Sequence, residues 1–578
     1  MYQSGLLILS PHIRPHKLSS LLKYAKNMVN EKLFLTVPQS PLNFTYWKRT
    51  ATLCYTIAYQ VCPSLNICLL LPAPPPHPPP PPKTTSLKPS VKFDIVISPE
   101  SEFSHAWILK EVHNIDPLYN DNILYATKDK FDLDPTVVDE KSNDHDDDDN
   151  NKSLDDSYQD ISHVCLGGTF DRLHNGHKIL LTVGALLAKQ QLLIGITCSK
   201  LLSGKCLSPF IYSWEKRQLA VQAFLSDIGV QLENVKIVEL SDEFGPPGYC
   251  PEFDCIVASS ESLRNCEKLN ELRQTKGFKP LKIEIIDFVC SESTHPDSNI
   301  YPFDPSDHKL SSSKVRFSQL GDLLKPVNDN NHQITSSPSS PYIIGLTGPA
   351  GSGKSSLAKR LAKLSEQIHI IDCDRLGHEA YVPGTPCHQA LLSHFGRENI
   401  ASQEPPYPID RRLLGNLVFS DPSKLKELNS IVWPEILKQI FTITKEIENN
   451  AMKHGQHCKR PVVILDAAVL LQAGWDQICN EVWLTILPHS EAQRRLCERN
   501  NLTPEAASER LTRQATGIAE ITGGYTWFEA GQYCCTKSPL DYAHVILSTQ
   551  WEPECSQYQV EKAWKKLQQR LPVTSTTQ

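Results

Sequence analysis

A chain of 578 residues is too long for a single hydrophobic core and predicts two or three domains. The hydrophobic share of 40% is ordinary for a soluble protein, and a formal net charge of −7 argues against a general nucleic-acid binder. The 18 cysteines show neither a C-x-x-C pair nor a metal-ligand spacing, which favours reduced thiols in an intracellular protein.

The first 160 residues predict a poorly ordered targeting or regulatory region. Residues 1–30 are basic and contain no acidic side chain, and Leu18, Leu21, Leu22 and Ala25 fall on one helical face. A basic amphipathic start is typical of a mitochondrial targeting segment, and an ordinary surface helix is the alternative. We therefore expect a mitochondrial location (outer membrane or matrix), a cytoplasmic one, or both.

Three further features of this region concern membranes and partners. Residues 53–71 are apolar, but Pro63 and polar residues interrupt them, so we expect no transmembrane span and at most membrane association. The tract Pro72–Pro82 must be extended and would act as a stiff spacer or as a ligand of an SH3 or WW domain. The acidic run Asp144–Asp149 reads as a solvated linker to the first catalytic domain.

A candidate phosphate site follows the strand predicted at residues 164–167. Next come Gly168-Thr169-Phe170-Asp171 and His174-Asn175-Gly176-His177, and then a predicted helix over residues 178–190. His174 and His177 are three apart and share a face at the start of that helix. Two imidazoles there can donate to phosphate oxygens with help from the helix dipole.

Downstream, strands and helices alternate. We predict strands over residues 191–197, 235–240, 255–258 and 281–289, which implies a parallel sheet of Rossmann type. The segment Leu310-Ser311-Ser312-Ser313-Lys314-Val315-Arg316 offers hydroxyls and cations that suit an anion. Residues 328–341, rich in Asn, Ser and Pro, read as an interdomain linker.

The second domain opens on a phosphate-binding loop. Gly348-Pro349-Ala350-Gly351-Ser352-Gly353-Lys354-Ser355 fits G-x-x-x-x-G-K-[ST], between a predicted strand at residues 342–347 and a predicted helix at 357–364. Such a turn aims backbone N–H groups at a polyphosphate. Lys354 can then reach the β- and γ-phosphates, and Ser355 can bind Mg²⁺. Further strands are expected near Ile368, Val462, Val482 and Val545, and an amphipathic helix over residues 559–571 closes the chain.

Both motif sets resemble known enzymes. Gly-Thr-Phe-Asp, His-x-Gly-His and Ser-Ser-Ser-x-x-Arg in this order resemble the nucleotidylyltransferase superfamily, above all its phosphopantetheine adenylyltransferases. The phosphate-binding loop, Ile371-Asp372-Cys373-Asp374 and Asp410-Arg411-Arg412 resemble dephospho-coenzyme A kinases. The order of the two is similar to that in bifunctional coenzyme A synthases. The resemblance implies an N-terminal region (1–160), an adenylyltransferase domain (161–327), a linker (328–341) and a kinase domain (342–573). These would be two parallel-sheet α/β domains, Rossmann-like and then P-loop, after the N-terminal region.

For the first domain, the resemblance implies transfer of AMP from ATP to 4′-phosphopantetheine, giving dephospho-coenzyme A and pyrophosphate. His177 would stabilise the transition state, His174 would bind ATP phosphates, and Thr169 would position the attacking phosphate. The remaining candidate substrate or ATP contacts are Ser312, Ser313, Arg316, Arg264 and a lysine. Lys205 and Lys200 both qualify for that lysine, and Lys205 is favoured because it follows a glycine. The stretch Val257–Ser262 with Arg264, Asn270 and Arg273, the substrate-like segment, resembles the substrate-site segment of the phosphopantetheine adenylyltransferases.

For the second domain, the resemblance implies phosphorylation of the ribose 3′-hydroxyl of dephospho-coenzyme A by ATP. Asp374 would accept the hydroxyl proton, with Asp372 as the alternative base, and Asp466 with Ser355 would hold Mg²⁺. ATP would be bound by Gly348, Gly351, Ser352, Gly353, Lys354, Ser355, Ser356 and Arg495. Arg495 belongs to a basic cluster with Arg494, Arg499, Arg510 and Arg513, of which one or two are expected to matter.

Some residues depart from the kinase pattern. Trp433-Pro434 stands where the bacterial enzymes have His-Pro, Gln472 stands where they often have Glu, and residues 517–540 form an insertion. The alternative to two active domains is one active half with the other kept as a nucleotide-binding regulatory domain. Because a proline tract and an acidic run separate residues 1–160 from the first phosphate site, we also expect that region to be dispensable for chemistry.

Overall fold

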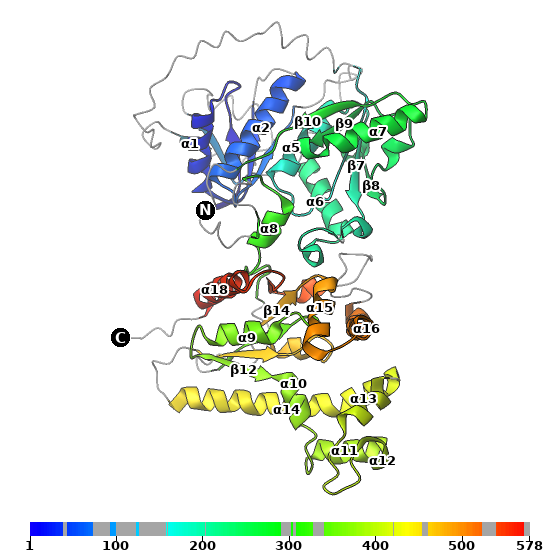
Figure 1. Ribbon diagram of the computed structural model, residues 1–578. Coiled ribbons are helices and arrows are strands. Elements are labelled where there is room, and N and C mark those ends of the chain that lie inside the picture. The colour runs from blue at the N-terminus through cyan, green and yellow to red at the C-terminus, as the bar shows by residue number, and fades with distance from the viewer. Residues whose placement is uncertain are drawn as a thin grey trace, which may run out of the picture. The chain divides into compact units, whose positions relative to one another are not determined.

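The computed structural model describes residues 1–37, 43–72, 93–99, 123–126, 158, 160–202, 204–290, 302–303, 308–327, 340–419, 421–453, 460–522 and 539–571. In this part of the chain, strands form three five-stranded sheets whose neighbouring strands are all parallel. The chain divides into two compact units: Met1–Gly204, Tyr212–Ser298 and Phe303–Val315 form the first; Lys205–Ile211, Asn299–Pro302 and Arg316–Gln578 form the second. Figure 1 labels their elements. The predicted two α/β domains are present, with a third sheet ahead of them.

The third sheet shows that the described part of the first 160 residues is folded, within a region that the sequence predicts to be poorly ordered. Its strand order is β3-β2-β1-β4-β5. The elements are β1 (Tyr2–Ile8), α1 (Pro15–Lys26), β2 (Val29–Thr36), α2 (Phe44–Val61), β3 (Asn66–Leu69), β4 (Ile95–Pro99) and β5 (Ile123–Ala126). Runs such as Leu6-Leu7-Ile8-Leu9 are fully buried, because strands in a parallel sheet are covered on both faces.

The apolar face that suggested a targeting helix has a structural role. Leu18, Leu21, Leu22 and Ala25 of α1 are all buried in the core of this sheet. Packing alone therefore explains that pattern, and mitochondrial targeting stays a prediction. Among the described residues, no helix has both the length and the apolar character needed to cross a bilayer. Residues 73–82 of the proline tract and the acidic run 144–149 lie outside the described residues.

The second sheet of the first unit has the order β10-β9-β6-β7-β8. Its elements are β6 (His163–Gly168), α5 (Asn175–Leu187), β7 (Gln191–Thr197), α6 (Trp214–Asp227), β8 (Val235–Leu240), β9 (Cys255–Ser259), α7 (Leu263–Thr275), β10 (Lys282–Ile286) and α8 (Ser312–Ser318), the last spanning the boundary between the units. The predicted strands and the Rossmann-type parallel sheet are confirmed. The strand β6 is central, so the turn that follows it lies at the middle of the carboxyl edge.

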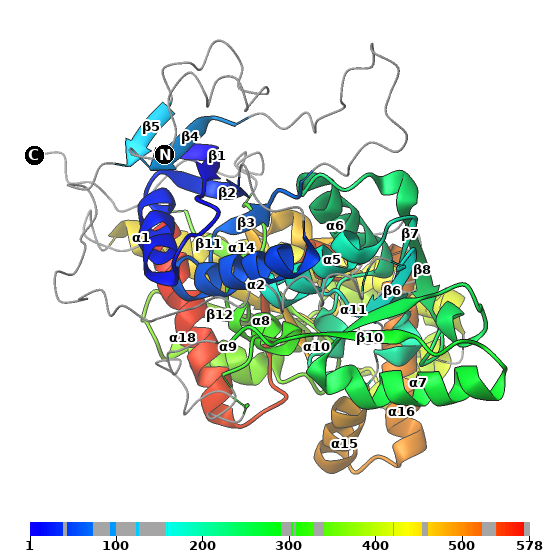
Figure 2. The same ribbon diagram turned by 90° about the horizontal axis from the view of Figure 1, so that it is seen from above.

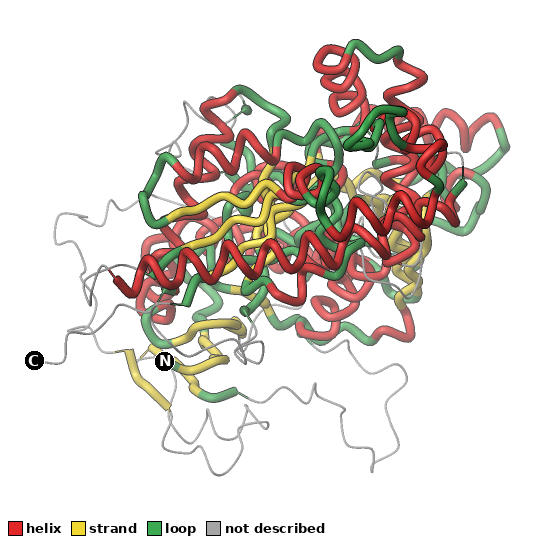
Figure 3. Tube along the Cα trace, turned by 90° about the horizontal axis from the view of Figure 1, so that it is seen from below, coloured by secondary structure: helices red, strands yellow, loops and turns green. Residues whose placement is uncertain are grey.

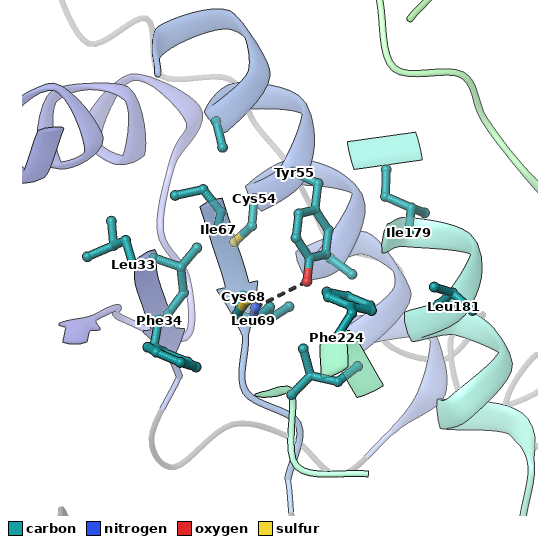
Figure 4. Packing of buried hydrophobic residues seen from close by; sticks show 14 of the residues in the cluster. Leu33, Phe34, Cys54, Tyr55, Ile67, Cys68, Leu69, Ile179, Leu181 and Phe224 are labelled. Atoms are coloured by element: carbon teal, nitrogen blue, oxygen red, sulfur yellow. Dashed lines mark hydrogen bonds between the residues drawn. The ribbon is translucent and has the colours of Figure 1, made fainter. Parts of the chain in front are cut away.

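One hydrophobic core serves both sheets of the first unit. Buried residues from β1 to β4 and from α5, β6 and β9 belong to a single continuous cluster. Helix α2 packs directly against α5, as Figure 2 shows from above. The close-up in Figure 4 places Tyr55 of α2 between Cys68 and Leu69 of β3 and Phe224 of α6. The N-terminal sheet is therefore built into the first unit and is not a separate appendage.

The second unit holds the third sheet, in the order β12-β13-β11-β14-β15. Its strands are β11 (Tyr342–Thr347), β12 (Ile368–Asp372), β13 (Val462–Asp466), β14 (Glu481–Ile486) and β15 (Val545–Ser548). Its helices are α9 (Lys354–Ala362), α10 (Cys373–Glu379), α11 (Pro386–Phe395), α12 (Arg397–Ile400), α13 (Arg411–Phe419), α14 (Pro422–Lys453), α15 (His489–Asn500), α16 (Pro504–Thr522), α17 (Pro539–Tyr542) and α18 (Pro553–Arg570). Figure 3 shows helices in red and strands in yellow. All five predicted strands are present, and residues 523–538 of the insertion lie outside the described residues.

Candidate active sites

The two predicted histidines of the first site lie together. His174 is the N-terminal cap residue of α5, and its ring stacks on that of His177 with centroids 3.9 Å apart. Gly176 lies between them, and a Cβ there would come within 3.2 Å of the His174 ring. Gly176 thus leaves the His174 ring room for this stacking. Both rings lie at the positive end of a helix dipole, where an anion is favoured.

The electrostatic state of His174 suits an anionic ligand. Burial, and then the neighbouring His177, hold the pKa of His174 well below its ordinary value of 6.5. The imidazole is therefore neutral at pH 7 in the absence of ligand. A bound phosphate would supply the opposite charge that favours the protonated form.

The turn before this helix is strained and anchored. Phe170 and Arg172 have positive φ angles of 51° and 48°, which side-chain-bearing residues rarely adopt. The carboxylate of Asp171 is fully buried and accepts two bonds of 2.9 Å from Arg172 Nη1. Its backbone carbonyl accepts a 2.9 Å bond from Ser312 Oγ. Asp171 therefore holds the turn in shape, and the hydroxyl of Ser312 contacts this turn, while the contact of Ser312 with ATP stays a prediction.

Arg217 fixes the neighbouring Thr169, a role that no motif in the sequence indicates. Its guanidinium is 1% exposed and donates to the carbonyls of Thr169 at 2.7 Å and Thr197 at 2.9 Å. These residues follow β6 or end β7, so one side chain joins the carboxyl ends of two strands. The hydroxyls of Thr197 and Thr169 are 3.4 Å apart. Arg217 is a positioning residue that only a three-dimensional structure reveals.

The other predicted contacts of the first site lie on several elements. Arg264 is exposed on α7, and Ser313 lies in the first turn of α8. Lys205 is exposed and Arg316 is buried, and both belong to the second unit. Arg316 Nη2 donates to the carbonyl of Cys206 at 2.7 Å. The structure brings His174, His177, Thr169 and Ser312 to one turn.

Two residues of the substrate-like segment have structural roles. Arg273 is fully buried and donates to backbone carbonyls that include those of Pro247 at 2.6 Å and Cys250 at 2.8 Å. Asn270 exchanges bonds of 3.0 and 2.7 Å with the backbone of Leu281. The segment's resemblance to a substrate site therefore reflects, at these two positions, the packing of α7.

The phosphate-binding loop has its predicted place between β11 and α9. Gly348, Gly351 and Gly353 have φ angles of 149°, 79° and 77°. Lys354, 9% exposed, folds back so that Nζ donates to the carbonyls of Gly348 at 3.1 Å and Pro349 at 3.3 Å. Ser355 and Ser356 are exposed in the first turn of α9. The loop is therefore shaped to enclose an anion.

A layer of polar side chains supports the loop. Ser352 Oγ lies 2.6 Å from Thr485 Oγ1 of β14, and Thr549 Oγ1 donates to the Ser352 carbonyl at 2.8 Å. Arg495 of α15 donates to Thr549 Oγ1 at 2.8 Å and forms an ion pair with Glu491 at 2.7 Å. In this structure Arg495 thus braces the loop from outside, which differs from the direct ATP contact expected from the sequence. That direct contact stays a prediction.

Charged groups gather around Lys354. Its pKa is lowered by burial and raised in part by Asp466 and Asp374, while Arg499 and Arg510 lower it further. Burial raises the pKa of Asp374 and of Asp466, and Lys354 opposes both shifts. Among the arginines of the basic cluster whose side chains the structure describes, Arg499 and Arg510 act electrostatically on Lys354. The sequence placed them in the cluster but did not single them out.

The two aspartates at the end of β12 have different roles. Asp372 caps α10, and its Oδ1 accepts a 2.9 Å bond from the backbone N–H of Arg375. Asp374 lies in the first turn of the same helix, and its carboxylate interacts with Lys354. Asp372 is therefore occupied as a helix cap, which leaves Asp374 as the better candidate for a base.

The residues predicted to hold Mg²⁺ fit that ion. Asp466 at the end of β13 is 6% exposed and is hydrogen-bonded to the hydroxyl of Ser355. Mg²⁺ prefers oxygen ligands and is commonly held by one or two protein groups together with substrate phosphates and waters. Within the described residues, no group of three or more His, Cys, Asp and Glu side chains forms a complete metal cage. Ser355 and Asp466 supply what a nucleotide-bound Mg²⁺ needs.

Comparison with known proteins gives a family for each set of motifs. Residues 342–521 match the dephospho-CoA kinase family, and residues 165–317 match the cytidylyltransferase-like family. A dephospho-CoA kinase of Carboxydothermus hydrogenoformans is 35% identical over 172 residues, 30% of this chain and 77% of that protein. One from Symbiobacterium thermophilum is 33% identical over 172 residues, 30% of this chain and 66% of that protein.

The first unit has a relative among adenylyltransferases. The phosphopantetheine adenylyltransferase of Saccharomyces cerevisiae is 36% identical over 153 residues, 26% of this chain and 47% of that protein. The chain thus spans about half the length of that relative. It belongs to the dephospho-CoA kinase family through its second unit, and it carries ahead of that kinase a cytidylyltransferase-like domain similar to phosphopantetheine adenylyltransferase.

Proposed function

We propose that the chain catalyses the last two steps of coenzyme A biosynthesis, an adenylyl transfer in the first unit and a phosphorylation in the second. The observation that carries the proposal is the presence of two separately built phosphate sites. One is the stacked pair His174 and His177 at the start of α5. The other is the loop at Lys354 with two aspartates. The family matches supply the substrate class for each.

In the first step, a phosphate oxygen of 4′-phosphopantetheine attacks the α-phosphorus of ATP. The bond from the α-phosphorus to the bridging oxygen breaks, and pyrophosphate leaves. The attacking phosphate is already an anion at neutral pH, so no general base is required. Catalysis then depends on orientation and on neutralising charge. His177 stabilises the transition state, His174 holds ATP phosphates, and Thr169, fixed by Arg217, positions the attacking group.

In the second step, the ribose 3′-oxygen of dephospho-coenzyme A attacks the γ-phosphorus of ATP. Asp374 accepts the hydroxyl proton, and ADP leaves with the former bridging oxygen. Lys354 moves from the carbonyls of Gly348 and Pro349 to the phosphates. Ser355 and Asp466 would hold Mg²⁺, which neutralises phosphate charge when it is bound with ATP. Arg499 and Arg510 add positive charge to the same site.

The test is a coupled assay on the full-length protein. Purified protein is incubated with 4′-phosphopantetheine and ATP-Mg²⁺, and dephospho-coenzyme A and coenzyme A are resolved by mass. We expect Lys354→Ala to stop at dephospho-coenzyme A. His177→Ala should fail in the first step and still convert added dephospho-coenzyme A. Loss of both steps in either folded variant would refute the two-site assignment.

The same assay decides whether only one half is active. In that alternative, the unsubstituted protein would convert added dephospho-coenzyme A but would form none from 4′-phosphopantetheine, or the reverse. Intact His174, His177, Lys354, Ser355 and Asp374 favour two active halves.

A further inference from the structure

The helix that carries His177 is buried on both sides. Residues 178–184 of α5 are all buried, from Lys178 through Leu181 to Gly184. One side of α5 faces its own sheet at β6 and β9, and the other faces α2 of the N-terminal sheet. A helix that is apolar all round must be covered on every side. The N-terminal sheet provides half of the cover that α5 requires.

The residue next to His177 is held by the N-terminal sheet. Lys178 is 5% exposed, and its Nζ donates to Asn66 Oδ1 at 2.7 Å and to the carbonyl of Ile67 at 2.8 Å, both in β3. Burying an ammonium group is costly unless its hydrogen bonds are satisfied. The position of Lys178, and with it the first turn of α5, is therefore tied to β3.

A second hydrogen bond holds the same turn of α5, and it is made by the residue that precedes Gly176. Asn175, the first helical residue of α5, donates from Nδ2 to the carbonyl of Tyr55 in α2 at 2.8 Å. The residues on either side of Gly176 and His177 are thus both bonded to the N-terminal sheet. A link elsewhere is the ion pair of Lys32 with Asp227 at 2.8 Å, which joins β2 to the end of α6.

We propose that the N-terminal sheet is part of the adenylyltransferase active unit, in which Asn66, acting through Lys178, positions His174 and His177. This inference rests on the adenylyl transfer proposed above. Orientation of reacting groups supplies much of the rate in a reaction without a general base. A displacement of the two imidazoles would therefore slow adenylyl transfer without touching the second unit. Asn66 and Lys178 are positioning residues and touch neither substrate.

The experiment uses three variants of the full-length protein. Asn66→Leu removes the acceptor of the Lys178 bond at similar volume. Asn66→Asp keeps an acceptor at the same place. Lys32→Met breaks a polar link that the N-terminal sheet makes elsewhere, to Asp227, and serves as the matched control. In each variant, the rate with added dephospho-coenzyme A measures the second unit in the same molecule.

We expect Asn66→Leu to lower the kcat of adenylyl transfer by about tenfold or more and to raise the KM for ATP, because the histidines bind phosphates. Asn66→Asp and Lys32→Met should stay close to the unsubstituted protein, and all three should phosphorylate dephospho-coenzyme A normally. A loss of folded protein alone would lower the rate without changing KM. Hydrogen exchange at residues 175–181 should accelerate in Asn66→Leu and not in Lys32→Met.

Two results would overturn the proposal: unchanged adenylyl kinetics and exchange in Asn66→Leu, or equal losses in Asn66→Leu and Lys32→Met at constant KM. Failure of the proposed function would look different. In that case the unsubstituted protein itself would transfer no adenylyl group, and hydrogen exchange would still decide whether Asn66 holds the first turn of α5.

Discussion

Replacing Gly348 by alanine should disable the second unit selectively. Gly348 opens the phosphate-binding loop with a φ of 149°. A Cβ there would lie 2.1 Å from Thr485 Oγ1 and 2.5 Å from the Thr485 carbonyl oxygen, where ordinary contact begins at 3.4 Å. Thr485 cannot yield easily, because it is fully buried in β14 and its hydroxyl donates to the Thr347 carbonyl.

The expected loss of rate follows from the overlap between the added Cβ and Thr485. The loop would have to move by about 1 Å to clear the Thr485 carbonyl, and a displacement of that size costs about 10²-fold in rate at a catalytic site. We expect Gly348→Ala to lower phosphorylation of dephospho-coenzyme A about a hundredfold and to leave adenylyl transfer unchanged. The assay follows both reactions in one preparation.

Gly384→Ala is the matched control. Gly384 also has a positive φ, 95°, but a Cβ there would meet no atom within 4 Å. Backbone strain should lower the free energy of unfolding of the Gly384→Ala variant by about 1–2 kcal/mol. Its rate of dephospho-coenzyme A phosphorylation should be retained. Phosphorylation by Gly348→Ala close to the unsubstituted rate would refute the reasoning. An equal loss in Gly384→Ala would attribute the effect to instability and not to displacement of the loop.

Asp374→Asn should lower phosphorylation about 10²–10⁴-fold, whereas Asp372→Asn should remain active because asparagine also caps a helix. Since burial raises the pKa of Asp374, the rate should fall on acidification at a pH above the ordinary aspartate range, and a pH–rate profile with its acid limb below that range would contradict this. Arg570→Met should destabilise the second unit by about 3 kcal/mol, because it leaves the fully buried carboxylate of Glu481 without its 2.7 Å ion pair; an unchanged urea midpoint would exclude that role. His544 has its pKa lowered to about 4, chiefly by burial, so it stays neutral in the folded state while the unfolded chain takes up a proton below pH 6.5. Stability from His544 should be lost as pH falls from 6.5 towards 4, and His544→Asn should reduce that pH dependence in urea titrations.

The phosphate-binding loop of the second unit was predictable because its motif is contiguous in the sequence. Eight consecutive residues define the loop, and the strand and helix beside it follow from hydrophobic periodicity. The ends of β12 and β13 were also predictable, since carboxylates directly follow apolar runs. The sequence alone could not show that Asp372 caps a helix while Asp374 faces Lys354. This difference depends on which carboxylate reaches the N–H of Arg375, and that is a matter of helix geometry.

The N-terminal sheet was missed for a related reason. Its first helix has the basic, acid-poor composition of a targeting segment, and its apolar runs resemble an interrupted membrane span. Only the surfaces that these segments pack against distinguish the interpretations: α1 packs on α2 and β2, and α2 packs on α5, more than a hundred residues downstream. The packing of α2 on α5 argues against the expectation that residues 1–160 are dispensable, because their removal would expose the outer side of α5, but that expectation stays a prediction. The positioning roles of Lys178 and Arg217 could not be predicted for the same reason, since their hydrogen-bond partners are distant in sequence.

The bond between Asn66 and Lys178 joins residues 112 positions apart, and this separation bears on how the chain folds during synthesis. Contacts of long sequence separation slow folding, and domains complete themselves in the order in which they leave the ribosome. The N-terminal sheet is made first, yet the side of α2 that packs on α5 stays uncovered until α5 has emerged. Until then, an apolar helical face is exposed and invites association with chaperones or with other nascent chains. The second unit meets the same requirement, because Ser352 of the phosphate-binding loop is hydrogen-bonded to Thr485 and Thr549, 133 and 197 positions further along the chain.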